Sequence, residues 1–552
     1  MRKLLTLIIL LPLIVSLNAQ DVFERHSIIP TLQYEPGGGG FGGFVAGVDF
    51  DNDGVPEIYA CNTNMIDRDG ELVPKVWKFE WNEATATWDS VWGAVPGIPL
   101  QNTWPAFTWG DLDNDGKPEI IWGPTNFLDA STNPNPWRVI VYEVVGDGSD
   151  NLGVDDGFGS FLPNAATTIT NNDNFDLRPF IFHVVDADND GTDDELVFVD
   201  RSSNAAGYSV GVLSVDDVPD LGGGGETWTI ESSGLGDPIL TGSGPFWDIG
   251  AINDVTYLFA QSGLVYPIKN ESGVYTTLPP QSGIANGSFK GSVSYDLDND
   301  GTDEILVAGW FSGATVYVLE QDGDTLISHP IADLTSMGGR RFLGAHLGDL
   351  DNDGNWDFVF GSRGDPPSVP NNAVFRMEYQ GGDITDSASY QFSIIDSFLV
   401  PEPDGMGGDL DVIRIANVDG DSAGEVIYTQ GYTRGIANDT TADAAILDIQ
   451  HTPVSVELAD DNIPDQYYLD QNYPNPFNPA TTIKFGLTTE MAVELKVFDI
   501  TGQEVITLID GQLMKPGSYN VHFDATNLAS GTYVYRLKAG NFVESKKMML
   551  LK

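Results

Sequence analysis

The residues with the clearest chemical potential in this sequence form a nine-residue acidic motif that occurs six times. Five copies have Asp at positions 1, 3 and 5, Gly at position 6 and an acid at position 9, whereas the sixth has Asn417 at position 1 and Ser422 in place of Gly. In chain order, loops 1 to 6 are DFDNDGVPE (49–57), DLDNDGKPE (111–119), DADNDGTDD (186–194), DLDNDGTDE (296–304), DLDNDGNWD (349–357) and NVDGDSAGE (417–425). Such repetition indicates a repeat architecture.

This spacing is typical of a calcium site. In a tight loop the side chains at positions 1, 3 and 5 converge, the glycine permits the turn, and the acid at position 9 closes the shell from the next strand. Four carboxylates within about 5 Å make six pairs, each repelling by roughly 3 kcal/mol at an effective dielectric constant near 20. We therefore expect a loop without metal to be loose or partly protonated. The alternative is a solvated acidic turn with no ion.

Strand-like segments lie on both sides of each loop. FVAGV, AFTWG, FIFHVV, GSVSY, LGAHLG and VIRIA precede the loops, and EIYA, EIIWG, ELVFV, EILVAG, DFVFG and EVIY follow them. Strands on both sides argue against an EF-hand, which requires a helix and a glutamate at position 12. The spacings between motif starts are 62, 75, 110, 53 and 68 residues, so a further copy is expected near residue 250. WDIGAINDVTYLFA (247–260) fits a repeat that kept its strands and lost its acidic loop.

A third segment follows each strand pair, and usually a fourth. The third segments are KVWKFEW (75–81), WRVIVYEVV (137–145), YSVGVLSV (208–215), GLVYPIK (263–269), ATVYVLE (314–320), AVFRMEY (373–379) and AAILDIQ (444–450). Seven units of four short antiparallel strands, about 60 residues each, predict a seven-bladed β-propeller. Closing the circle leaves few exposed strand edges.

Charge and cysteine content exclude several classes of protein. The 552 residues include 26 Lys and Arg against 81 Asp and Glu, a net charge of −55, which excludes nucleic-acid binding through a basic surface. Cys61 is the single cysteine, so neither an intramolecular disulfide nor a thiolate metal cluster can form. Hydrophobic residues make up 41% of the chain, enough to bury more than one core.

The N-terminal residues have the layout of a secretory signal peptide. Arg2 and Lys3 precede an apolar run at 4–17, and small and polar residues follow up to Ala19. The 14-residue run is shorter than the roughly 20 residues of a membrane-spanning helix. We expect a signal peptide at 1–19 and no membrane span; the alternative is a buried N-terminal helix.

The composition changes near Asp460. Residues 462–552 contain 8 basic and 9 acidic residues, so nearly all the negative charge belongs to the preceding domain. Short alternating segments at 481–487, 492–500, 504–509, 518–523, 531–540 and 544–552 predict a small β-sandwich. The expected fold class is all-β, a seven-bladed β-propeller followed by a small immunoglobulin-like β-sandwich.

The C-terminal segment resembles a known sorting domain. NYPNPFNPATTIKFGL, FDITGQEV, KPGSYNVHFD, LASGTYVYRLKAG and KKMMLLK, in this order over about 80 residues, are similar to the C-terminal sorting domain of type IX secretion cargo of Bacteroidetes-type bacteria. The resemblance implies recognition by an outer-membrane translocon, usually followed by removal of the domain and release or attachment to surface lipopolysaccharide. The alternative is an immunoglobulin-like module that is never cleaved. The expected domains are the signal peptide (1–19), the propeller (20–455), a linker (456–470) and the sorting domain (471–552).

The acidic repeats resemble the calcium-binding FG-GAP or VCBS repeats of integrin-α-like propellers, over about residues 25–455. The resemblance implies about five or six Ca²⁺ sites, with a backbone carbonyl at position 7 and weaker binding in loop 6. The implied side-chain ligands are Asp49, Asp51, Asp53 and Glu57; Asp111, Asp113, Asp115 and Glu119; Asp186, Asp188, Asp190 and Asp194; Asp296, Asp298, Asp300 and Glu304; Asp349, Asp351, Asp353 and Asp357; and Asn417, Asp419, Asp421 and Glu425.

No catalytic motif accompanies these loops. The six histidines are scattered, and G-x-S-x-G, H-E-x-x-H and Walker patterns do not occur. His183 and His346 lie in strands leading into loops, where we expect core or inter-blade histidines. Eight of the twelve tryptophans lie between Trp77 and Trp137, where they either stack on sugar rings or pack between blades.

We therefore expect a secreted or cell-surface calcium-binding β-propeller that acts as a binding or adhesion protein. Its expected partners are the type IX secretion machinery and a glycan or surface protein, because loops on a rigid scaffold commonly carry recognition. The alternative is a secreted polysaccharide-degrading enzyme, a lyase or glycoside hydrolase, which predicts carboxylates, or an acid with Arg or Lys, at the central opening. A structural surface protein without a small ligand is a third possibility.

Overall fold

A computed structural model describes most of the chain. The described residues are 22–30, 40–63, 75–82, 84–96, 104–124, 137–168, 179–187, 191–201, 210–231, 245–271, 274–285, 287–311, 313–363, 372–398, 410, 412–418, 424–430, 443–450, 454–460, 464–489, 491–500, 502, 504–525, 530–540 and 542–551. The signal peptide expected at 1–19 lies outside them. Phe23–Asp448 form one compact unit, and Ile449–Lys552 belong to another.

The first unit consists of antiparallel sheets, most of which have four strands that follow one another in the chain. The first three sheets are β2 (Gly40–Val48), β3 (Glu57–Thr63), β4 (Val76–Asn82) and β5 (Thr87–Ala94); β6 (Ala106–Gly110), β7 (Glu119–Gly123), β8 (Val139–Glu143) and β11 (Ala165–Thr167); and β12 (Pro179–Val185), β13 (Glu195–Asp200), β14 (Val210–Val215) and β15 (Trp228–Ile230). A small hairpin, β9 (Val154–Asp155) and β10 (Phe161–Leu162), is inserted between β8 and β11.

The next three sheets repeat this order. They are β16 (Phe246–Ile252), β17 (Val255–Ala260), β18 (Leu264–Glu271) and β19 (Val274–Thr277), with β20 (Gln281–Ser282) also pairing with β18; β21 (Ser292–Tyr295), β22 (Glu304–Ala308), β23 (Thr315–Asp322) and β24 (Thr325–Asp333); and β25 (Arg341–Gly348), β26 (Asp357–Arg363), β27 (Asn372–Tyr379) and β28 (Tyr390–Phe398). Two short 3-10 helices, η1 (Leu334–Met337) and η2 (Ser387–Ser389), are the only helices within the described ranges.

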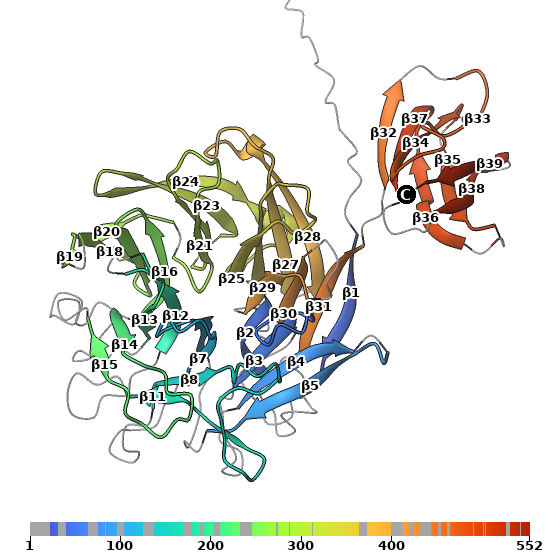
Figure 1. Cartoon of the computed structure of the whole chain (residues 1–552). Coiled ribbons are helices and arrows are strands. Elements are labelled where there is room, and N and C mark those ends of the chain that lie inside the picture. Colours follow the sequence, from blue (N-terminus) through green and yellow to red (C-terminus); the bar gives the residue numbers. More distant parts are fainter. Residues whose placement is uncertain are drawn as a thin grey trace, which may run out of the picture. The chain divides into compact units, whose positions relative to one another are not determined.

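The last sheet joins the two ends of this unit. It combines β29 (Ile413–Ala416), β30 (Glu425–Gln430) and β31 (Asp443–Gln450) with the N-terminal strand β1 (Val22–Ile29). The first strands of successive sheets contact one another in the order β2, β6, β12, β16, β21, β25 and β29, and β29 contacts β2 again. The sheets therefore form a closed circle around a common centre (Figure 1). Pairing β1 with β31 ties the circle shut, because it cannot open without separating these strands.

The sheet sequences explain this packing. Every residue of β3, β7, β22 and β26 is buried, whereas the outer strands β5 and β24 mix buried and exposed residues. Second strands such as EIIWG and EILVA suit positions covered on both faces by neighbouring sheets. One core cluster accordingly contains Tyr59 of β3 beside Trp122 of β7. Another joins Ile58 to Ile427 and Ile446 of the last sheet.

The sheet near residue 250 confirms the sequence interpretation of that segment. Strands β16 and β17 pair through Ile252 and Val255, and only Asn253 and Asp254 stand between them. Asn253 has a φ of 52°, a left-handed conformation that Asn tolerates. The strands of the repeat are present, and a two-residue turn replaces the acidic loop.

The second unit contains two four-stranded antiparallel sheets around one core. One sheet has the order β32 (Val454–Asp460), β37 (Gly517–Asp524), β34 (Ala480–Leu487) and β33 (Tyr468–Leu469); the other has the order β36 (Glu504–Met514), β35 (Met491–Phe498), β38 (Gly531–Ala539) and β39 (Phe542–Leu550). Their shared core includes Phe485, Val497, Val521 and Tyr535.

Part of the segment expected as a linker, 456–470, differs from that expectation. Most of β32 and all of β33 fall within it, and they pair with β37 and β34 of the second unit. The alternation V-S-V-E-L-A-D at 454–460 has the period of a strand, and it lets the segment extend a sheet edge. Within the described part of the chain, no helix has the length and apolar character needed to cross a membrane.

Candidate functional site

The acidic loops occupy equivalent places in their sheets. Loop 1 joins the first strand, β2, to the second strand, β3, and loops 2 to 6 make the corresponding connection in five other sheets. Because the connection is the same each time, the loops lie at the same end of the first strands, around one face of the circle. Asp188, Asp190, Asp419 and Asp421 of the predicted ligand set lie outside the described residues.

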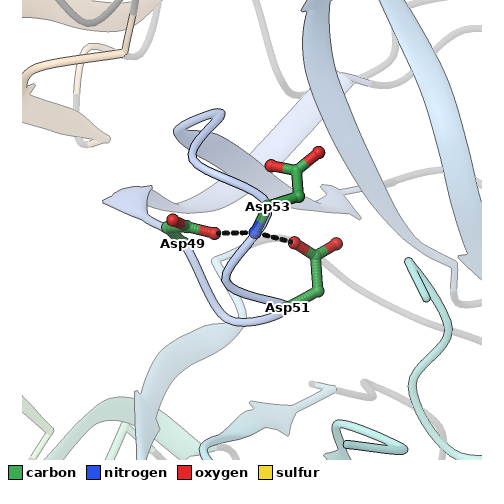
Figure 2. Close-up of side chains that lie close together, drawn as sticks. All are labelled: Asp49, Asp51 and Asp53. Atoms are coloured by element: carbon green, nitrogen blue, oxygen red, sulfur yellow. Dashed lines mark hydrogen bonds between the residues drawn. The ribbon is translucent and has the colours of Figure 1, made fainter. Parts of the chain in front are cut away.

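The carboxylates at positions 1 and 3 accept hydrogen bonds from the loop backbone (Figure 2). The Asp53 N–H lies 3.1 Å from both Asp49 Oδ1 and Asp51 Oδ1, and the Gly54 N–H donates to Asp49 Oδ2 at 3.1 Å. Loops 2 and 4 repeat this pattern with Asp111 and Asp113, and with Asp296 and Asp298. In loop 5, the Asp353 N–H donates to Asp349 Oδ1 at 3.1 Å.

Positions 4 and 6 give the loop its sharp turn. Gly54 has a φ of 90°, where a side chain would be strained, so the glycine at position 6 is required by the backbone. Asn52, Asn114, Asn299 and Asn352 at position 4 also have positive φ, between 55° and 61°. The motif alone did not predict a role for these asparagines, although Asn is enriched in this conformation.

The acid at position 9 is buried at the start of the second strand. Its carboxylate accepts the backbone N–H of position 2: Phe50 to Glu57 at 3.2 Å, Leu112 to Glu119 at 2.9 Å, Leu297 to Glu304 at 3.0 Å, Leu350 to Asp357 at 2.8 Å and Val418 to Glu425 at 2.7 Å. In loop 3, the Ala187 N–H donates to Glu195 at 2.8 Å instead of to Asp194. Loop 3 is thus one residue longer, and Glu195, which opens β13 as Glu304 opens β22, is a residue that the motif alone missed.

Loop 2 satisfies a structural test for a cation. Oxygens of Asp111, Asp113 and Asp115 lie within 4.8 Å of one another, and the same holds for Asp113, Glu119 and Glu143. Oxygens around a Ca²⁺ ion at 2.3–2.6 Å have comparable separations. Glu119 is fully buried, and its Oε1 has no hydrogen-bond partner among the described residues. A buried carboxylate oxygen of this kind requires a cation or a proton.

The electrostatics of the position 9 acids lead to the same requirement, and burial also raises the pKa of Asp357 in loop 5 to about 7. Burial, together with the charges of Asp113, Asp111 and Glu143, raises the pKa of Glu119 to about 9. Burial and the neighbouring Asp298, Asp300 and Asp296 raise the pKa of Glu304 to about 7. Each carboxylate is therefore costly to ionise unless a positive charge is added.

Loops 1 and 5 contain such a charge on the third strand of their own sheet. Lys78 of β4 places Nζ 2.6 Å from Asp51 Oδ2, 2.6 Å from Glu57 Oε1 and 2.8 Å from Glu80 Oε1. Arg376 of β27 contacts Asp351 at 2.6 Å, Asp357 at 2.5 Å and Glu378 at 2.7 Å. Both cations are buried. Burial lowers the pKa of Lys78, but its carboxylate partners outweigh that effect and raise it.

Third-strand acids are further site residues that sequence reasoning missed. Glu80, Glu143 and Glu378 stand directly opposite the position 9 acids Glu57, Glu119 and Asp357 in the strand register. Burial is the first cause that raises the pKa of Glu143 to about 8. The available signal was the acid near the end of these three third segments, which becomes informative only once strand register is known.

His346 and most of the tryptophans between Trp77 and Trp137 have structural surroundings. His346 Nδ1 accepts the Ile415 N–H at 3.3 Å across neighbouring sheets, and burial lowers the pKa of this histidine to about 3. Trp77, Trp88, Trp92, Trp104 and Trp122 are buried, whereas Trp109 and Trp137 are 47% and 40% exposed. The sugar-stacking alternative for these tryptophans therefore has two exposed candidates, Trp109 and Trp137.

Comparisons with known proteins identify two kinds of module. Residues 49–122 and 296–360 match the FG-GAP-like repeat, and residues 471–551 match the secretion system C-terminal sorting domain. No curated protein matches the chain.

Three of the solved structures that resemble this chain are the following, and each is only distantly similar to it. The N-terminal domain of Nup159 is 9% identical, with 78% of this chain and 97% of that chain covered and a TM-score of 0.38. The β-propeller domain of Cps50 (Swd1) from Myceliophteria thermophila is 11% identical, with 72% and 95% covered and a TM-score of 0.35. PorZ, a type IX secretion component of Porphyromonas gingivalis, is 10% identical, with 93% and 87% covered and a TM-score of 0.22.

The two kinds of family match lie in different units of the molecule, the FG-GAP-like repeats in the first unit and the sorting domain in the second. The FG-GAP matches begin at loops 1 and 4 and end within or beside β7 and β26, so they span acidic loops and the sheets that hold them. The sorting-domain match covers β34 to β39 of the second unit. This chain thus carries FG-GAP-like repeats on a circle of β-sheets and ends in a type IX secretion system C-terminal sorting domain.

Proposed function

We propose that this protein is an exported, calcium-stabilised seven-bladed β-propeller that binds a glycan or protein partner at or outside the cell surface. The C-terminal unit is an immunoglobulin-like sandwich that presents the chain to the type IX secretion machinery. The sorting-domain match supports export, and the closed order of sheets supports the blade count. Calcium occupies loops 2 and 4, where the buried position 9 acids face other carboxylates and, among the described residues, pair with no Lys or Arg.

The observation that carries this proposal is the link between loop 2 and two projecting segments. Asp113 Oδ2 accepts the Val218 N–H at 2.7 Å, and Asn164 donates to the Pro219 carbonyl at 3.1 Å. These contacts join loop 2 to the β14–β15 connection and to the chain that follows the β9–β10 hairpin. A calcium ion that fixes Asp113 therefore also fixes the base of both segments.

Both segments expose large apolar side chains. Phe158 is 94% exposed in the β9–β10 turn, and Leu221 is 86% exposed in the β14–β15 connection. Exposed apolar side chains on loops held by a rigid scaffold are suited to recognition. Calcium would act here by holding a binding surface in shape, and the proposed function is binding without a chemical reaction.

Melting of the purified full chain with calcium and with a calcium chelator tests the metal. Calcium bound only to the folded state at a hundred times its Kd adds about 2.7 kcal/mol per loop. We expect a clearly higher Tm in calcium than in chelator. Identical melting curves in the two conditions would remove calcium from the proposal.

A glycan array tests recognition with matched variants. We expect calcium-dependent binding by the unmodified chain and its loss in Phe158→Ser/Leu221→Ser. Val274→Ser is the control, because Val274 is 64% exposed on a different sheet, β19. Equal binding by both variants would exclude the proposed surface, and release of shortened oligosaccharides would favour the polysaccharide-degrading enzyme instead.

A further inference from the structure

The third strands differ at one position beside otherwise equivalent acidic loops. Lys78 stands opposite Tyr59, two residues beyond Glu57, and Arg376 stands opposite Val359, two residues beyond Asp357. The corresponding residue is Val141 opposite Ile121 in the sheet of loop 2, and Val318 opposite Leu306 in the sheet of loop 4. Loops 1 and 5 thus face a cationic side chain where loops 2 and 4 face an aliphatic one.

The cations reach the same two positions of the motif in both loops. Lys78 Nζ contacts the acids at positions 3 and 9, Asp51 and Glu57, and Arg376 contacts Asp351 and Asp357 at these positions. Their nitrogen–oxygen distances of 2.5–2.6 Å approach the 2.3–2.6 Å between Ca²⁺ and its ligand oxygens. A metal bound to the same oxygens would overlap the nitrogen and be repelled by its charge.

Loops 2 and 4 differ from loops 1 and 5 in this respect. Among the described residues, no Lys or Arg forms an ion pair with Glu119 or Glu304, the acids at position 9. Lys117, the cation of loop 2, contacts Asp115, Glu143 and Asp220 from a side chain that is 26% exposed. Glu119 Oε1 remains buried without a hydrogen-bond partner.

We propose that Lys78 and Arg376 take the place of the metal, so that loops 1 and 5 hold their shape without calcium while loops 2 and 4 depend on it. The inference rests on the calcium role proposed above and divides the acidic loops into two classes. Two blades of the circle thereby stay fixed at any calcium concentration, and the calcium-sensitive part includes loop 2 and its projecting segments.

The test is the number of calcium ions bound per full-length chain, measured by equilibrium dialysis, with folding followed by circular dichroism. Lys78→Met removes the cation and keeps most of the side-chain volume, so we expect one additional calcium per chain. Val318→Lys introduces the cation beside loop 4, and we expect one fewer. Arg376→Met repeats the first change at loop 5, and Lys269→Met, a half-buried lysine on β18, is the control with no expected change.

The outcomes separate this inference from the proposed calcium role. If the unmodified chain binds no calcium, the calcium role fails and the inference fails with it. If the unmodified chain binds calcium but Lys78→Met and Arg376→Met add none, only the inference is overturned. Failure of both Met variants to fold in calcium also overturns it, because calcium should then substitute for the missing cation. Val318→Lys should show a smaller calcium-induced rise in Tm than the unmodified chain, because loop 4 no longer contributes to that rise. A rise as large as in the unmodified chain also overturns the inference.

Discussion

Loop 1 and loop 2 have almost the same sequence and different electrostatics. DFDNDGVPE and DLDNDGKPE fold into the same backbone turn. In both loops the first aspartate, Asp49 or Asp111, accepts a hydrogen bond from the backbone N–H at position 5. In loop 1, Lys78 forms an ion pair with Glu57; in loop 2, Val141 occupies the equivalent place and, among the described residues, no Lys or Arg pairs with Glu119. A motif can therefore specify a turn without specifying what neutralises its charge.

The difference is important because a buried acidic cluster can be neutralised in only a few ways. A resident side chain is always present, whereas a metal depends on its concentration outside the protein. Removing one partner of a buried ion pair also destabilises the folded protein strongly, typically by about 3–5 kcal/mol, because the other charge is left buried without a partner. Loops of the two classes should therefore respond in opposite ways to substitution and to chelation.

The largest expected effect comes from removing an acid at position 3 in each class. Asp298→Ala in loop 4 should lower stability by about 2.7 kcal/mol in saturating calcium and change it little in chelator. Asp51→Ala in loop 1 should lower stability by about 2 kcal/mol in both conditions, because Lys78 loses one charge-assisted partner whether or not calcium is present but keeps Glu57 and Glu80. Melting curves in calcium and in chelator measure both effects. Equal losses for Asp298→Ala in the two conditions would count against a metal in loop 4.

An effect that is smaller for each pH unit concerns the protonation of His346, which we expect to be independent of the acidic loops. The pKa of His346 lies at about 3 in the folded chain, below the ordinary value of about 6.5, because burial and the nearby Arg414 disfavour the charged ring. As pH falls below 6.5, the unfolded chain binds the proton first, so stability decreases by about 1.4 kcal/mol per pH unit.

His346→Gln should flatten this acid-dependent loss, because Gln does not titrate in this pH range, and the effect should be the same with and without calcium. Gln is a suitable replacement because it can still accept the Ile415 N–H. Denaturant unfolding between pH 4 and pH 7 measures the slope. If the substitution changes the slope only in calcium, His346 is linked to loop 5, which follows its strand β25. Loop 5 would then respond to calcium, contrary to its assignment to the loops that contain a resident cation.

The smallest expected effect concerns Lys117, the half-buried cation of loop 2. Exposed ion pairs contribute about 0.2–1 kcal/mol, so Lys117→Met should change stability in chelator only slightly. Removing its positive charge should strengthen calcium binding at loop 2 by less than about tenfold. Calcium titration by calorimetry measures this change. A marked loss of calcium binding would show that Lys117 supports the site, contrary to its position beside Asp115 and Asp220.

Strand positions were predictable because local patterns determine them. The segments expected at 481–487, 504–509, 518–523 and 531–540 correspond to β34, β36, β37 and β38 to within a few residues. Alternating apolar residues identify such strands without knowledge of their partners. Pairing partners were harder to predict: the joining of β1 to β31 involves residues more than 400 positions apart, and no local pattern records it.

By itself the sequence determined the acidic turns, their glycine and the strands around them, because these depend on backbone conformation and on residues within about ten positions. Tertiary structure decided which loops contain a cation. Lys78 is separated from Asp51 by 27 residues and Arg376 from Asp351 by 25, and only the register between second and third strands brings these pairs together. Charge neutralisation in a buried site depends on distances through space, and the motif specifies only the distances along the chain.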